Sequence, residues 1–147
     1  MLLLAALMLA VAVAAVVVAR ERSRCTRESA ELSISAARSV LQVGESLAVI
    51  LVLRNTGCIG LGLPQYRLYV ESEGGRGVLV PEQPESIVHS IGVVPGGFDE
   101  AVFVLEAVAA GTARLRGTAS FEVHLGYPGP AYWGSTSSGG ITVTVES

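Results

Sequence analysis

The side chains that could perform catalysis in this sequence are few and scattered. His89 and His124 are the only histidines, and both lie in segments of alternating apolar and polar residues, outside any recognisable catalytic motif. Covalent catalysis needs a nucleophile with a base and an orienting group, and glycoside hydrolysis needs two carboxylates with separated pKa values. Eleven acidic residues follow residue 30, so chance pairs are expected and none is singled out. We therefore predict that the protein is not an enzyme and assign no catalytic residue.

Cofactor and metal motifs are also missing from the sequence. The glycine-rich stretches at residues 74–77, 96–97 and 139–140 lack the following helix and the lysine of a phosphate-binding loop. The two cysteines cannot hold zinc alone, and no histidine stands at ligand spacing to either one. A net charge of −3 with 5% aromatic residues argues against nucleic-acid binding. The sequence thus predicts no cofactor, no metal and no nucleic-acid partner.

The first nineteen residues determine the expected location. Residues 1–19 contain no polar or charged side chain, and as a helix they would extend about 28 Å, roughly one hydrocarbon core. We predict a signal anchor here, with a signal peptide cleaved after Ala19 as the alternative, because Val17 and Ala19 are small residues of the kind that signal peptidase prefers. The protein is thus expected in the cell membrane as a single-pass chain, or secreted if the leader is removed.

Residues 20–30 form a basic stalk, in which Arg20, Arg22, Arg24 and Arg27 follow the leader. The positive-inside rule would keep these arginines in the cytoplasm, whereas the strand-rich domain that follows favours export. We expect an extracytoplasmic domain. Every basic residue is Arg, and Asn55 and Asp99 are the only Asn and Asp, which suggests a GC-rich genome and agrees with a thermophilic, archaeal-like source.

Residues 31–147 show an apolar period of two, and no window of a dozen residues keeps a helical stripe. Strands are expected at 31–36, 46–54, 65–72, 78–80, 87–94, 98–106, 112–125 and 141–146. The pair 65–72 and 78–80 reads as a hairpin around a glycine turn. The pattern predicts an all-β fold, an immunoglobulin-like Greek-key β-sandwich of seven or eight strands preceded by one N-terminal transmembrane or signal helix.

Residues 46–54, SLAVILVLR, are apolar on both faces. Leu47, Val49, Leu51 and Leu53 are expected inward, and Ala48, Ile50 and Val52 outward. Such a strand is typically central and covered on both sides, here by a partner chain.

Two cysteines test the arrangement of the first two predicted strands. If these strands form a hairpin with Leu32 opposite Leu51, Cys25 lies opposite Cys58 just beyond its open end. An exported protein is expected to join them, and the closed loop would add on the order of 3–4 kcal/mol of stability. The alternative is two unrelated thiols, one in the stalk and one in a loop.

Three loops are expected to share one end of the sandwich. Residues 125–140, LGYPGPAYWGSTSSGG, read as a loop carrying Tyr127, Tyr132 and Trp133, either as a rigid recognition surface or as an aromatic plug over the open end. The other two loops contain residues 55–64 and 95–98. The candidate interaction tip consists of Asn55, Thr56, Gly57, Gly96, Gly97, Phe98, Tyr127, Tyr132 and Trp133.

The stretch VGESLAVILVLRNTG (43–57) resembles the CARDB modules of archaeal and bacterial surface proteins. That resemblance implies a stalk, spacer or binding unit without catalysis. Asn55 to Gly57, the pair Gly96 and Gly97, and Tyr132 with Trp133 are also similar, in order, to the three loops of chagasin-type inhibitors of papain-like cysteine peptidases. In this chain Ala-Tyr replaces the family's Arg-Pro before the Trp.

The sequence therefore favours a membrane-anchored, extracytoplasmic module of the cell envelope. Its expected partner is another envelope protein, or a further copy of the chain joined by strand addition. A chagasin-like peptidase inhibitor is the first alternative, and a carbohydrate or small-ligand binding module that uses Tyr132 and Trp133 is the second.

Overall fold

The computed structural model describes residues 30–74, 77–124 and 131–147. The leader at residues 1–19 and the stalk at residues 20–29 lie outside this part. The described residues form nine strands: β1 (Ala30–Ala36), β2 (Val40–Gln42), β3 (Ser46–Asn55), β4 (Leu61–Ser72), β5 (Leu79–Pro81), β6 (Ser86–Val88), β7 (Phe98–Ala107), β8 (Gly111–His124) and β9 (Ala131–Glu146). A helix long and apolar enough to cross a membrane is not found in these three segments.

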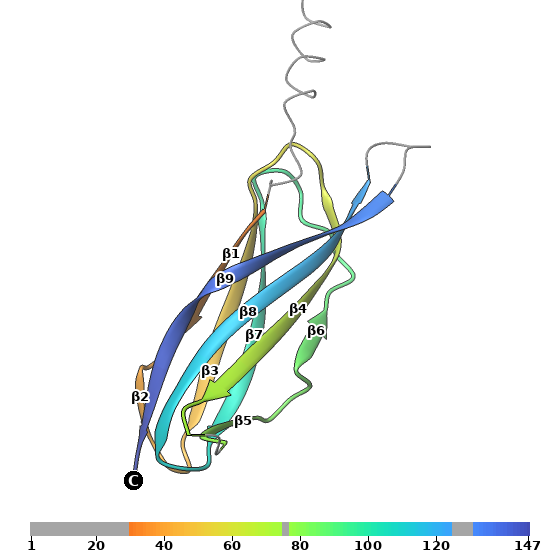
Figure 1. Cartoon of the computed structure of the whole chain (residues 1–147). Coiled ribbons are helices and arrows are strands. Elements are labelled where there is room, and N and C mark those ends of the chain that lie inside the picture. The colour runs from red at the N-terminus through yellow and green to blue at the C-terminus, as the bar shows by residue number, and fades with distance from the viewer. Residues whose placement is uncertain (1–29, 75–76, 125–130) are drawn as a thin grey trace, which may run out of the picture.

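The strands make two sheets that pack face to face as an elongated sandwich (Figure 1). The four-stranded sheet has the order β1-β3-β7-β5, and the five-stranded sheet has the order β2-β9-β8-β4-β6. The predicted all-β sandwich is confirmed. The described chain has one strand more than expected because β2, at three residues, is too short to show alternation. It pairs in parallel with the last residues of β9.

The core lies between the two sheets and follows the period-two pattern. Leu47, Val49, Leu51 and Leu53 of β3 are fully buried, as predicted. Strand β3 lies between β1 and β7, so it is central in its sheet. Its opposite face is only half-buried. A strand that buries one face against the other sheet and leaves aliphatic residues on the second face accounts for the double apolar pattern.

The predicted register of β1 and β3 is wrong by two residues, since Leu32 pairs with Leu53 rather than with Leu51. The segment between these strands contains β2, which belongs to the other sheet. No tight turn therefore fixes the pairing, and the register follows from the burial of the facing residues.

The expected hairpin of residues 65–72 and 78–80 is also wrong. Strand β4 pairs with β8 and β6, whereas β5 pairs with β7 in the opposite sheet. Val78 and Leu79 are buried in the core at this crossing. The expected strand at 87–94 is reduced to β6 and one isolated bridge from Leu61 to Val93.

Residues 131–140 are not a loop, because β9 begins at Ala131, opposite His124 of β8. The antiparallel pairing of β8 with β9 therefore includes the Ser- and Gly-rich residues 134–140. An irregularity between Arg116 and Thr118 interrupts it, and there the Ser138 hydroxyl accepts a hydrogen bond from the Gly117 N–H at 2.8 Å.

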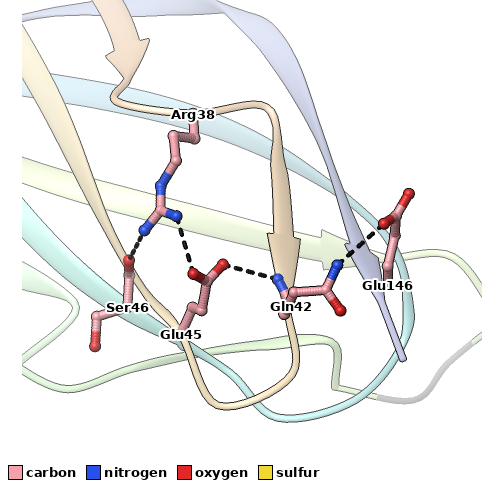
Figure 2. A network of polar contacts seen from close by, with 5 residues as sticks. All are labelled: Arg38, Gln42, Glu45, Ser46 and Glu146. Atoms are coloured by element: carbon pink, nitrogen blue, oxygen red, sulfur yellow. Dashed lines mark hydrogen bonds and ion pairs between the residues drawn. The ribbon is translucent and has the colours of Figure 1, made fainter.

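A polar network holds β2 against β9 at one end of the sandwich (Figure 2). Arg38 Nη1 donates to Glu45 Oε1 at 3.0 Å, the Gln42 N–H donates to Glu45 Oε2 at 2.8 Å, and Gln42 Nε2 donates to Glu146 Oε2 at 3.1 Å. The hydrogen bond from the Gln42 backbone, followed by that from Arg38, holds the pKa of the Glu45 carboxyl below its ordinary value. Ala30 lies toward the opposite end, where it pairs with Asn55 (Figure 1).

Candidate functional site

Asn55, the last residue of β3, organises the end of the sandwich that carries the predicted tip. Its side chain is fully buried. Nδ2 donates to the carbonyl oxygens of Ile59 at 2.8 Å and Val93 at 2.9 Å, while Oδ1 accepts from the Gly57 N–H at 3.0 Å. The side chain is therefore used to hold two loops together and is not presented to solvent.

The backbone of Asn55 also brings the second predicted segment to the same place. Its N–H donates to the Gly97 carbonyl, and its carbonyl accepts from the Gly96 N–H, both at 3.0 Å. Gly96 has φ 76°, a left-handed conformation that suits glycine. Thr56 is exposed, and Phe98 is 63% exposed opposite Arg54. The structure thus places Asn55, Thr56 and Gly57 beside Gly96, Gly97 and Phe98.

The two aromatic residues of β9 do not act together. Trp133 pairs with Glu122 and is 56% exposed on the outer face of the five-stranded sheet. Tyr132 pairs with Val123 and packs against the core. Consecutive strand residues point to opposite faces, so these rings cannot form one surface. Tyr127 lies outside the described residues.

A shallow hollow of about 500 Å³ lies at this end of the sandwich. Its walls come from the ends of β4 and β8 and from the segment before β7, and its lining includes Leu61, Gly92, Val93, Pro95 and His124. Leu61 bridges to Val93 and pairs with Val123, which joins these segments. His124 is the only titratable side chain in the lining, and its Nε2 lies 3.2 Å from Glu122 Oε2. An apolar hollow with one imidazole at its rim suits contact better than catalysis.

The predicted disulfide stays a prediction. Cys58 lies in the exposed loop between β3 and β4, whereas Cys25 lies outside the described residues.

Sequence reasoning missed a partly buried polar cluster that ties the two sheets together. Asp99 Oδ2 accepts a hydrogen bond from the Tyr66 hydroxyl at 2.7 Å and lies 2.7 Å from His89 Nδ1. The Tyr66 and His89 rings meet edge to face at 5.5 Å. Burial, and next the Asp99 carboxylate, raise the pKa of Tyr66 above its ordinary value. The available signal was Asp99 itself, the single polar residue among the inward positions of β7.

Tyr66 belongs to the five-stranded sheet and Asp99 to the four-stranded sheet, so their hydrogen bond joins the two sheets. Across the described segments, no group of three or more His, Cys, Asp or Glu side chains could hold a metal ion.

The outer face of the four-stranded sheet carries an aliphatic surface, which we call the apolar face. It consists of Ala48, Ile50 and Val52 from β3 and Val102 and Val104 from β7. Cross-strand pairs join Ile50 to Val102 and Ala48 to Val104. Val102 is 46% exposed. The sequence predicted this face from the double apolar pattern of residues 46–54.

Charged residues surround the apolar face. Glu31, Glu100 and Glu106 point outward on the same side as these aliphatic residues, with Arg54 opposite Glu31. Glu82, whose N–H donates to the Val104 carbonyl, lies beside this face as well, so acids predominate at the rim.

No protein-family model and no curated protein matches the sequence. Among solved structures, the chain is similar to the CARDB domain of a Pyrococcus furiosus protein. The crystal structure of that domain in complex with di-metal ions has 18% identity and a TM-score of 0.52, over 82% of this chain and 96% of that chain. Its solution NMR structure has 16% identity and a TM-score of 0.51, over 80% and 96%. The C-terminal domain of wzt has 11% identity and a TM-score of 0.54, over 81% and 74%. The fold is thus CARDB-like, as the sequence resemblance predicted.

Proposed function

We propose that this protein is a non-catalytic interaction module of the cell envelope, held in the membrane by residues 1–19 with its CARDB-like, immunoglobulin-like sandwich outside the cytoplasm. The observation that carries the proposal is the apolar face. Ile50 and Val102 lie side by side at its centre, on the regular part of the sheet. A contiguous aliphatic surface with a charged rim is typical of a protein-protein contact.

The rim of the apolar face selects the kind of partner. Glu31 and Glu100 lie at one end of this face and Glu106 at the other. Two copies packed through the face would bring acidic side chains together, and like charges at an interface oppose association. The expected occupant is therefore a different envelope protein, with an aliphatic surface flanked by Arg or Lys.

The course of the chain supports this surface over the tip. Ala30 pairs with Asn55, so the stalk joins the sandwich at the tip. The ten residues 20–29 can extend over at most about 36 Å, which keeps the tip close to the anchored leader. The apolar face runs along the sandwich, away from this junction, and remains accessible.

Photo-crosslinking tests the proposed contact. A photoreactive amino acid replaces Val102 on the apolar face or, as a control, Thr142, which is exposed on the other sheet. In cells, we expect one defined protein adduct from position 102 and none from position 142. Adducts of the same pattern from both positions, or none from either, would contradict the proposal.

The anchor and the topology need a separate measurement. We expect the chain in the membrane fraction of lysed cells, and we expect protease added to intact cells to cut the domain. A domain that resists protease until the cells are opened would place it in the cytoplasm.

The inhibitor alternative has less support from the geometry, because Asn55 is buried and Trp133 lies on a strand. We expect the full-length chain not to inhibit papain at micromolar concentration. Inhibition that is lost on Trp133→Ala would restore the chagasin-like function.

A further inference from the structure

The opposite face of the sandwich offers a second, chemically different surface. We propose that the outer face of the five-stranded sheet binds an anionic polysaccharide, centred on the hollow between Arg67, Tyr69 and Thr118. This inference goes beyond the proposed protein contact and uses none of its residues.

Strand register builds the hollow from outward-pointing side chains. Arg67 pairs with Thr118, Gln65 with Ser120, and Tyr69 with Arg116, so β4 and β8 contribute alternate rows to one surface. The hollow measures about 250 Å³. Its lining includes Gln65, Arg67, Tyr69, Ser86, Thr118 and Ser120. Hydroxyl, amide, guanidinium and phenol groups thus meet in one place.

Two arginines provide positive charge at the hollow. Hydrogen bonding from Arg67, and next from Thr118, holds the pKa of Tyr69 below its ordinary value, and both residues line the hollow with Tyr69. The Arg116 guanidinium carbon lies 5.9 Å from the centre of the Tyr69 ring. Its Nη2 is 3.7 Å from Glu71 Oε1, with both side chains more than half exposed. A solvent-exposed pair at that distance leaves Arg116 available to another anion.

The distribution of arginine makes this surface stand out from the rest of the molecule. The chain has a net charge of −3. Arg67, Arg114 and Arg116 nevertheless all point outward from neighbouring strands of the same sheet. Glu71 and Glu122 also point outward on this face, but the cross-strand neighbours of Arg67 are the uncharged Thr118 and Ser86. An anionic ligand is therefore drawn to the hollow at Arg67.

The donor set selects a polysaccharide among anionic ligands. Guanidinium groups bind carboxylates and sulfates through paired hydrogen bonds, while Gln65, Ser86 and Ser120 match sugar hydroxyls. Tyr69 and Trp133 are exposed aromatic rings on the same face. Their cross-strand partners on β8, Arg116 and Glu122, are about six residues or about 20 Å apart, a separation that suits a long ligand rather than a single sugar. An apolar centre, as a protein contact would need, is missing from the lining of this hollow.

Binding of defined polymers tests the inference. Purified full-length protein in a mild detergent is titrated by calorimetry with polygalacturonate, with chondroitin sulfate, and with neutral dextran as the control polymer. We expect binding to at least one acidic polymer and none to dextran. Arg67→Gln and Arg116→Gln are each expected to weaken binding about tenfold, the loss of one charge-assisted contact.

A matched variant separates a site from diffuse charge attraction. Arg54→Gln removes the same charge from the outer face of the other sheet and is expected to leave the affinity unchanged. An equal loss for Arg54→Gln and Arg67→Gln, equal binding of dextran, or no binding of either acidic polymer would each overturn the inference. Val102 crosslinking does not depend on these residues, so the two proposals can fail independently.

Discussion

Replacing Asn55 by Ala removes three hydrogen bonds that join two loops to the end of β3. The carbonyl of Val93 lies in a buried residue, while Gly57 and Ile59 are half-buried. After truncation the Val93 oxygen still accepts the hydrogen bond from the Leu61 N–H at 2.9 Å, and the space left by the amide is small. We therefore expect destabilisation of the folded domain rather than a selective loss of binding.

The magnitude follows from the burial of the three groups. The Val93 oxygen keeps a second donor and water can reach the half-buried groups, so each of the three lost hydrogen bonds costs about 0.5–1.5 kcal/mol. We expect a loss of about 3 kcal/mol. For a domain of about 120 residues this corresponds to a fall in Tm of about 10 °C.

Urea denaturation of the parent and variant chains measures this loss directly. Asn55→Asp is a second test, because a carboxylate can still accept from Gly57 but cannot donate to two carbonyls, so it should cost at least as much at neutral pH. Thr56→Ala is the control, since Thr56 is exposed, and should stay within about 0.5 kcal/mol of the parent. An Asn55→Ala loss under about 1 kcal/mol would refute the reasoning.

Three further outcomes are expected. Gly92→Ala should destabilise the domain by about 1–3 kcal/mol in urea denaturation, because its new methyl group would lie 2.8 Å from the Leu61 carbonyl oxygen. Gly139→Ala is the control, since a methyl group there has no atom within 4 Å. Burial raises the pKa of Tyr66 above its ordinary 10.0. Above that pH the unfolded chain releases a proton that the folded chain keeps, so the free energy of unfolding should fall as pH rises. Tyr66→Phe should flatten this fall in urea denaturation across roughly pH 9–11. Arg67→Gln should raise the lowered pKa of Tyr69 toward its ordinary value in an ultraviolet absorbance titration, and an unchanged titration would remove Arg67 from the phenol.

Local alternation was enough to predict most strands and the inward set of β3. Leu47, Val49, Leu51 and Leu53 are buried as expected, because period-two burial is a property of a single strand and does not depend on its neighbours. The partners of the strands were harder to predict. A glycine-rich turn such as the one after β4 is compatible both with a hairpin within one sheet and with a crossing to the other sheet. Here the chain crosses, because β4 and β5 belong to different sheets.

The Ser- and Gly-rich start of β9 shows where propensity misleads. Residues 134–140 have weak strand propensity, yet they pair with residues 116–121 of β8. The alternating pattern of β8 extends to His124 and needs a partner on that side. Tertiary pairing therefore decides the conformation of a segment that reads as a loop by composition.

The structure brings together only part of the candidate tip. Asn55, Gly96 and Gly97 do meet, because the ends of β3 and the start of β7 are neighbours in one sheet. Sequence spacing carries no information on whether a side chain faces solvent or backbone, so the burial of Asn55 was not predictable. Asp99 was visible as an isolated acid, but its partners Tyr66 and His89 come from distant segments.

The ends of the described sandwich have a mechanical consequence. Ala30 enters beside Asn55 at one end, whereas β2 and the last residues of β9 meet at the other (Figure 1). Tension applied between Ala30 and Glu146 therefore acts along the strands, so the hydrogen bonds of each ladder are loaded in shear and must break together rather than one after another. A domain with its ends so arranged can transmit a pulling force along its length without peeling apart.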